Sequence, residues 1–149
     1  MSGPTLPTLV RHNVWANDEW IALMQGCQPP PAELLRIMSH VLLGEQAWFQ
    51  RLADENPDRD IWRTLSTGAL REMHTQHAER YRALLDADVD RLVEFVRFTA
   101  ERGRASVGDI LVHLALHGAH HRGQLAARAA AYGIACPNTD FIQFNLSLV

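Results

Sequence analysis

The sequence contains no lysine, only two cysteines and no long apolar run. All 14 of its basic residues are arginines, and with 17 acidic residues they give a formal net charge of −3. A protein that binds DNA or RNA needs a basic patch or stripe, so this charge pattern argues against a nucleic-acid partner. The absence of lysine also removes that residue type as a candidate catalytic base.

The two cysteines, Cys27 and Cys136, lie far apart and neither belongs to a Cys-x-x-Cys pair. We expect two free thiols in a reducing cytoplasm, with a disulfide or a catalytic cysteine as alternatives. No apolar run approaches the roughly 18 residues that span a bilayer. The first residues also lack the basic and apolar segments of a secretory signal. These absences predict a cytoplasmic protein with no membrane association.

The composition is that of a globular protein. Hydrophobic residues make up 47% of the 149-residue chain and charged residues 21%. This length suits one domain with a substantial buried core. No internal repeat or low-complexity tract divides the sequence. We therefore expect a single domain over residues 1–149.

Apolar residues recur at helical spacing in four long segments. Spacings of three, four and seven residues are typical of amphipathic helices, and they predict helices over residues 6–24, 31–53, 67–85 and 106–132. Pro31 suits the first turn of the second helix. Ser106 suits the N-cap of the last helix, with Asp109 three residues on, and Gly133 suits its end.

The remaining segments are shorter. Residues 92–99 alternate in polarity and are rich in β-branched and aromatic types, which predicts an extended segment or short strand. Residues 101–104 suggest a turn, and the tail, 135–149, suggests an irregular segment packed against the body. The whole pattern predicts an all-α fold, a four-helix bundle with a short extended segment before the last helix.

Four of the chain's eight histidines fall between residues 113 and 121. Residues four apart on a helix lie about 40° apart around its axis, so His113, His117 and His121 form one row. Much of this helix is apolar, so the row should point inward. A buried imidazole without a partner costs about 1–3 kcal/mol, and a metal ion removes that cost. The row therefore predicts a metal site, with packing in the core as the alternative.

A catalytic metal site usually has three protein ligands and one open position. The third ligand should come from a facing helix, where His40 lies at the margin of the apolar face. Other metal motifs do not fit. A zincin needs glutamate where Gly118 stands, and a di-iron bundle needs glutamate where Leu114 and Gly118 stand. The His-x-Glu and Cys-x-x-Cys patterns of nucleobase deaminases are also absent.

Several segments together carry a family resemblance: Ser39-His40-Val-Leu-Leu-Gly44-Glu-Gln-Ala-Trp48, His113-x3-His117-x3-His121-Arg-Gly-Gln124, Asn13-Val-Trp15-Ala-Asn17 and Thr139-Asp140-Phe-Ile. They resemble the DinB-like (DNA-damage-inducible, YfiT-like) family of metal-dependent proteins. The resemblance covers most of the chain and implies a four-helix bundle. It also implies that the metal is held by His40, His117 and His121.

The other histidines receive different roles. His113 could orient a ligand or a bound water from one turn away, and His120 is expected on a pocket wall or the surface. We expect His12, His74 and His77 on the surface, although the last two have a weak chelate spacing.

Small residues accompany the histidine motifs. Gly44, Gly118 and Gly123 lie in or near the ligand-bearing turns, where glycine is costly for a helix and so suggests close packing or room for a ligand. Trp48 belongs either to the core or to a pocket wall. The alanine-rich run over residues 126–131 suggests close packing within the bundle or a helical dimer interface, and the resemblance favours a homodimer.

Two functions of different classes fit these residues. The first is an enzyme: an open metal position lowers the pKa of bound water toward about 7 and yields a hydrolase, or a low-molecular-weight thiol binds there and the protein is an S-transferase. The family it resembles includes thiol-dependent S-transferases and a mycothiol-dependent isomerase. The second is a non-catalytic metal-binding protein of a stress response.

The sequence leaves the reaction open. No serine or carboxylate is an obvious general base, and Glu45, five residues after His40, should point elsewhere. Three imidazoles suit zinc, nickel, iron or copper. Among divalent ions we expect zinc or nickel, with iron or manganese as alternatives. The small-molecule substrate is not identified by any motif.

Overall fold

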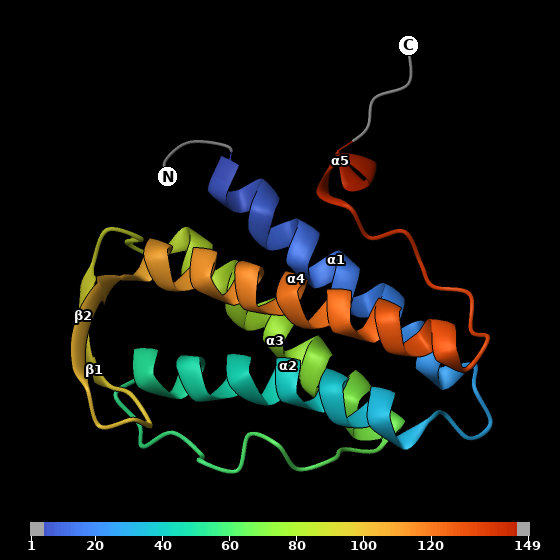
Figure 1. Cartoon of the computed structure of the whole chain (residues 1–149). Helices are drawn as coiled ribbons and strands as arrows, with labels where there is room; N and C mark the ends of the chain where they lie inside the picture. Colours follow the sequence, from blue (N-terminus) through green and yellow to red (C-terminus); the bar gives the residue numbers. More distant parts are fainter. Residues whose placement is uncertain (1–4, 146–149) are drawn as a thin grey trace.

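The computed structural model describes residues 5–145, which are mostly helical with one small two-stranded sheet (Figure 1). The helices are α1 Thr5–Gln25, α2 Ala32–Leu52, α3 Thr67–Asp86, α4 Val107–Ala131 and the short α5 Phe141–Phe144. The prediction of a mostly helical chain is confirmed. Pro31 precedes α2 as its N-cap residue rather than lying inside the helix.

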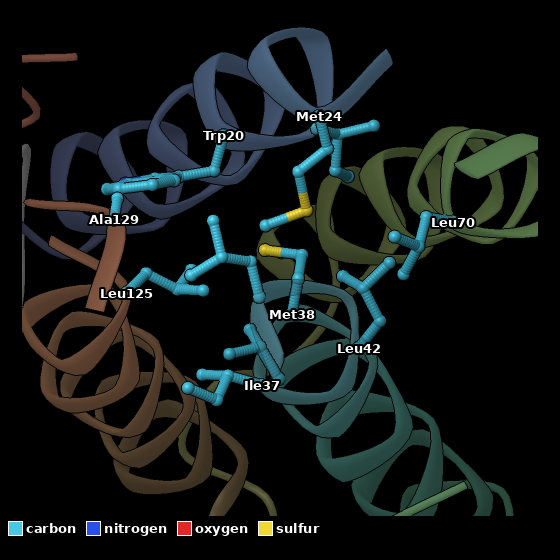
Figure 2. Close-up of a cluster of buried hydrophobic side chains, with 11 residues drawn as sticks. Trp20, Met24, Ile37, Met38, Leu42, Leu70, Leu125 and Ala129 are labelled. Carbon is cyan, nitrogen blue, oxygen red and sulfur yellow. The ribbon is translucent and has the colours of Figure 1, made fainter. Parts of the chain in front are cut away.

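The four long helices pack through two apolar clusters. α2 contacts α3 and α4, and α1 contacts the same two helices. Figure 2 shows the first cluster, in which side chains of all four helices meet: Trp20, Met24, Ile37, Met38, Leu42, Leu70, Leu125 and Ala129. The second cluster lies toward the other end of these helices and includes Leu6, Val10, Phe49, Tyr81, Val93, Ile110, Leu111 and Leu114. The burial of these side chains is the main driving force for packing the helices.

A β-hairpin spans the ends of α2 and α4, at the left of Figure 1. Strand β1 Leu92–Val96 pairs antiparallel with β2 Arg102–Ser106, and Phe95 faces Gly103. The predicted extended segment is confirmed, but the predicted turn at 101–104 is wrong because these residues, from Arg102 on, form β2. Gly103 leaves space for the Phe95 ring, since a Cβ atom there would lie 2.9 Å from it.

The ends of α4 follow the expected local chemistry. The Ser106 hydroxyl accepts a hydrogen bond from the Asp109 backbone N–H at 3.0 Å, as an N-cap does. Gly133 has a φ of +68°, the left-handed conformation that favours glycine after a helix. Both predicted helix boundaries are therefore confirmed.

The tail contains one short helix that was not predicted. α5 contacts α1, and the His12 ring bonds the Thr139 carbonyl oxygen at 2.7 Å. The expected return of the tail onto the body is confirmed for the part up to residue 145, but residues 141–144 are helical rather than irregular. The last four tail residues lie outside the described range. None of the helices in residues 5–145 is both long and apolar enough to cross a bilayer.

Candidate metal centre

Three histidines from two helices meet in the groove between α2 and α4. His40 comes from α2, while His117 and His121 lie one turn apart on α4, and their ligand nitrogens all lie within 4.8 Å of one another. The Nε2 atoms of His40 and His117 are 3.2 Å apart. The structure thus brings together the three residues that the sequence singles out. Their binding of a metal stays a prediction.

Hydrogen bonds fix the orientation of two of these rings. His40 Nδ1 bonds the Ile61 carbonyl oxygen at 2.9 Å, and His121 Nδ1 bonds the Gln124 side-chain oxygen at 2.7 Å. Because these oxygens only accept, each Nδ1 carries the proton and each Nε2 keeps its lone pair. Metal-binding histidines commonly use such outer partners to fix the tautomer.

The spacing of the rings fits a small divalent ion. Imidazole nitrogens bind zinc at about 2.0–2.1 Å in tetrahedral geometry, which places two of them about 3.3 Å apart. The 3.2 Å between the Nε2 atoms of His40 and His117 is close to this value. In the metal-free protein, the same distance lets the Nε2–H group of His117 donate a hydrogen bond to the Nε2 lone pair of His40. The donor set of neutral nitrogens suits a borderline transition metal.

Burial keeps the three imidazoles neutral. It lowers the pKa of His117 to about 3, with further lowering from His121 and His40. It also lowers the pKa values of His40 and His121, in each case as the largest cause. A buried site disfavours the charged form of histidine, and neutral imidazole is the form that binds metals.

We expect the stability of the metal-free protein to fall below about pH 6.5. Burial lowers the folded-state pKa of His40, His74 and His117 from 6.5. Below pH 6.5 the unfolded chain therefore binds more protons than the folded chain, and the free energy of unfolding decreases as the pH falls. Urea unfolding at about pH 7.5 and about pH 5 measures this loss. If the free energy of unfolding instead increased as the pH falls, these histidines would not be held neutral by burial in the folded protein.

An aromatic side chain covers one face of His40. The rings of His40 and Trp62 are stacked, with centroids 3.6 Å apart and planes at 5°. The segment between α2 and α3, which carries Ile61 and Trp62, runs back along α2 in Figure 1. No helical or motif pattern in the sequence points to this loop, although an Ile-Trp pair in an otherwise polar segment is a signal of its contact with the protein body.

Gly44 makes room for the ring of His117. A Cβ atom at residue 44 would lie 2.9 Å from His117 Cε1, closer than carbon atoms normally approach. Gly44 is one turn after His40, so α2 carries both a candidate ligand and the gap for its partner. At Gly123, by contrast, a Cβ atom would meet no atom of the described part of the chain within 4 Å, so this glycine makes no such space.

We expect Gly44→Ala to weaken metal binding by roughly 10–100-fold, the cost typical of disturbing the surroundings of a metal ligand. The new methyl group would displace the His117 ring. Gly123→Ala is the matched control on α4; it should leave metal affinity unchanged and stabilise the helix by up to about 1 kcal/mol. Titration of both variants with Zn²⁺ and thermal unfolding measure these effects. Equal affinities in the two variants would contradict this role of Gly44.

A cavity of about 460 Å³ opens beside the histidines. Its wall includes His40 and His117 but not His121. Trp48 lines the cavity, which favours the pocket-wall interpretation of this residue, and its ring contacts that of His113 at 5.4 Å between centroids. The cavity therefore reaches two of the three candidate ligands and has a volume typical of small-molecule sites.

The two remaining histidines of α4, His113 and His120, are both exposed and lie outside the cluster, so the expectation that the whole row points inward is wrong for His113. The His113 ring is in the cavity wall, with its centroid 6.0 Å from that of His117. Within residues 5–145 it makes no hydrogen bond to a candidate ligand, so the expected orienting role has no contact to support it. His120 is exposed, as predicted, and its ring lies 5.0 Å from that of His121.

The prediction that His12, His74 and His77 lie on the surface is wrong, because all three are buried. His77 bonds Glu45 Oε2 at 3.1 Å and Gln46 Oε1 at 3.0 Å. The inner face of α3 includes Leu70, His74, His77 and Tyr81, a helical spacing of four, three and four residues. This spacing is the sequence signal for an inner face of α3, and the surface prediction overlooked it.

A buried polar network lies between the two apolar clusters; its members are Asn13, Asn17, Glu45, His77 and Arg122. The Arg122 guanidinium donates to the side-chain oxygens of Asn13 at 2.9 Å and Asn17 at 2.6 Å. The Asn17 amide donates to Glu45 Oε1 at 2.8 Å. Asn17 thus links a buried cation to a buried carboxylate.

The buried polar network also bears on the metal centre. Arg122 directly follows His121, so its bonds to α1 fix the rotation of α4 next to a candidate ligand. Gly118 leaves room for this contact, since a Cβ atom there would lie 2.4 Å from the Asn13 side-chain oxygen. Glu45 points away from His40, as predicted, but its place in the network was missed. The pair Asn13 and Asn17 was noted only as a sequence motif.

Comparison with known proteins gives one clear result. The model of the DinB family matches residues 1–147, a range that contains every residue of the histidine cluster and of the buried polar network. A search of curated proteins gives no match.

Proposed function

This chain belongs to the DinB family, and on that premise we propose that it binds one divalent transition-metal ion through His40, His117 and His121. The convergence of these side chains supports the proposal, because their ligand nitrogens lie within 4.8 Å of one another. Zinc or nickel is the favoured ion, and iron or manganese also suits three imidazoles.

We further propose that the protein is an enzyme, either a metal-dependent hydrolase or a thiol-dependent S-transferase. The observation that carries this proposal is the cavity of about 460 Å³ whose wall includes His40 and His117. A metal ion held there would act as a Lewis acid and favour the nucleophilic form of water or of a low-molecular-weight thiol near neutral pH. The cavity gives a substrate access to that position.

The residues around the histidine cluster have distinct roles in the proposed reaction. Ile61 and Gln124 hold the rings of His40 and His121 through the hydrogen bonds described above. Trp48 provides an apolar wall that keeps a substrate against the cluster. His113, in the same wall, is the residue available to accept a proton, since burial and Arg97 lower its pKa and leave it neutral.

The alternative is a non-catalytic metal-binding protein of a stress response. One observation favours it: in the part of the chain that the structure describes, no carboxylate bonds any of the three clustered histidines. Among residues 5–145, the cavity wall contains a single carboxylate, that of Asp109, which lies eight positions before His117 on α4. A carboxylate at that distance along α4 does not directly adjoin the cluster, as the base of many metal-dependent hydrolases does.

An open metal position separates the two functions. The Co²⁺-loaded protein should change its visible absorption when azide or 2-mercaptoethanol is added, because either can enter a free coordination position. The loaded protein is then assayed for ester hydrolysis and thiol transfer. An absorption spectrum that neither probe alters would favour the non-catalytic alternative.

We also propose that residues 1–149 form one domain of the four-helix-bundle class, located in the cytoplasm and assembled as a homodimer. Exposed small side chains on α4 support the dimer, namely Ala127, Ala130 and Ala131. Sedimentation analysis of the wild type and of Ala130→Glu tests the assembly. A monomeric wild type would remove this part of the proposal.

A further inference from the structure

We propose that the hairpin end of the cavity binds the carboxylate of an elongated small-molecule substrate through Arg51 and Arg97. The apolar body of the substrate would lie along Trp48 and Phe98, and its reacting end would face His40 and His117. This inference rests on the proposed function, because it names the substrate class of the same cavity.

Arg51 carries a positive charge that no acidic side chain neutralises within residues 5–145. Its Nε donates to the Val96 carbonyl oxygen at 3.2 Å, and its guanidinium lies 4.7 Å from the ring centre of Trp48 and 4.5 Å from that of Phe98. These contacts hold the guanidinium in place and leave its terminal N–H groups available. A fixed planar guanidinium suits bidentate binding of a carboxylate.

Other positive charges surround Arg51. Burial is the main cause that lowers the pKa of Arg51, and nearby Arg59 and Arg97 lower it further. Arg59 donates to the Phe98 carbonyl oxygen at 3.2 Å. Arg97 pairs with exposed Glu101 at 2.7 Å, while its side chain also lines the cavity. Arg51 and Arg59 lie 4.5 Å and 4.9 Å from the centre of the Phe98 ring. A bound anion would relieve the repulsion among these arginines.

The cavity wall has more positive than negative charge. Two arginines line it, Arg51 and Arg97, against one carboxylate, Asp109, which is exposed in the first turn of α4. Phe95 and Phe98 come from the hairpin and the residues after β1, so they form an apolar wall opposite α2. A substrate with an anionic group at one end and an apolar body beyond that group would match the residues that line the cavity.

The length of the cavity sets the shape of the substrate. His40 and Arg51 lie eleven positions apart on α2, which corresponds to about 16 Å along a helix axis. Gly44 and Trp48 lie between them on the same wall. A compact anion could not contact both ends. The proposal therefore requires a molecule with its carboxylate several bonds away from its reacting atom.

The test compares 4-phenylbutyrate with its neutral amide, 4-phenylbutyramide, by calorimetric titration of the full-length, metal-free protein. Omitting the metal removes coordination of the carboxylate by the ion as a source of binding. The wild type should bind the carboxylate roughly tenfold more tightly than the amide. Arg51→Gln should bind both equally while it keeps the affinity for the amide. Arg51→Lys should retain part of the preference, and Arg63→Gln, which alters a surface arginine outside the cavity wall, should retain all of it.

Three results would overturn the proposal. The wild type could bind the two probes with equal affinity, it could bind neither probe, or Arg51→Gln could lose affinity for both probes to the same extent. Arg97→Gln provides a second test if Arg51→Gln does not fold, and it should also reduce the preference. The outcome is independent of the metal site. The preference for the carboxylate should persist in His121→Ala, which removes a candidate metal ligand outside the cavity wall.

Discussion

Replacement of His117 or His121 by alanine should abolish high-affinity binding of a divalent ion. Each change removes one of three nitrogens that lie within 4.8 Å of one another. Loss of an outer partner of a metal ligand typically costs 10–100-fold in affinity, so loss of a ligand itself should cost more than about 100-fold. Competition titration with a chromogenic zinc chelator measures the Kd of each variant.

The control for this prediction is His74→Ala. His74 is also a buried histidine, but it lies on α3 outside the cluster, and its Nδ1 has no hydrogen-bond partner among residues 5–145. This variant should therefore bind metal as the wild type does. Full stoichiometric binding in both α4 variants would mean that the row of histidines only packs the groove between α2 and α4.

Glu45→Ala should reduce the free energy of unfolding by about 3–5 kcal/mol, the usual cost of leaving a buried charge without its partner. Glu45 is 1% exposed and accepts hydrogen bonds from Asn17 and His77. Burial lowers the pKa of Arg122 to about 10, and Glu45 is the largest influence that raises it. Without this carboxylate, Arg122 would remain buried with only neutral partners.

Urea and thermal unfolding of Glu45→Ala test this prediction, and Tm should fall by roughly 10 °C. Glu79→Ala is the control, because its ion pair with Arg82 is on the surface and should contribute less than about 1 kcal/mol. Glu45→Gln keeps the shape of the side chain but removes its charge. Its free energy of unfolding should fall by an amount between the losses in Glu79→Ala and Glu45→Ala. If Glu45→Ala were as stable as Glu79→Ala, the buried polar network would have no structural importance.

Helical spacing predicted the row of histidines on α4, two of which, His117 and His121, belong to the cluster. The intervals between His113, His117 and His121 place them in one row whatever the tertiary structure, because that row is a local property of a helix. The choice of His40 on another helix needed the family resemblance in addition to its position on the wheel. Local geometry cannot show which positions on two helices face each other.

The buried polar side chains could not be predicted in the same way. His77 and Glu45 are polar residue types that usually lie on the surface, and their burial depends on partners far away in the sequence. Asn17 satisfies Glu45, and Arg122 depends on Asn13 and Asn17. A hydrophobic pattern in one helix carries no information about such partners, so His77 was placed on the outside.

Strand β2 and the loop over His40 were missed for different reasons. β2 reads as a turn because Gly103 stands between two arginines, whereas in the structure the glycine lets the Phe95 ring approach the strand closely. Trp62 lies far from any helical pattern, and its stacking on His40 depends on the path of the loop. Both features arise from tertiary packing.

The metal content of the protein, purified without an affinity tag or a metal column, tests the central claim most directly. Elemental analysis of the wild type should give about one divalent ion per chain, as expected for a mononuclear site, and the same analysis of His40→Ala should give almost none. If the wild type held no metal even after incubation with zinc or nickel, the three histidines would not form a metal centre.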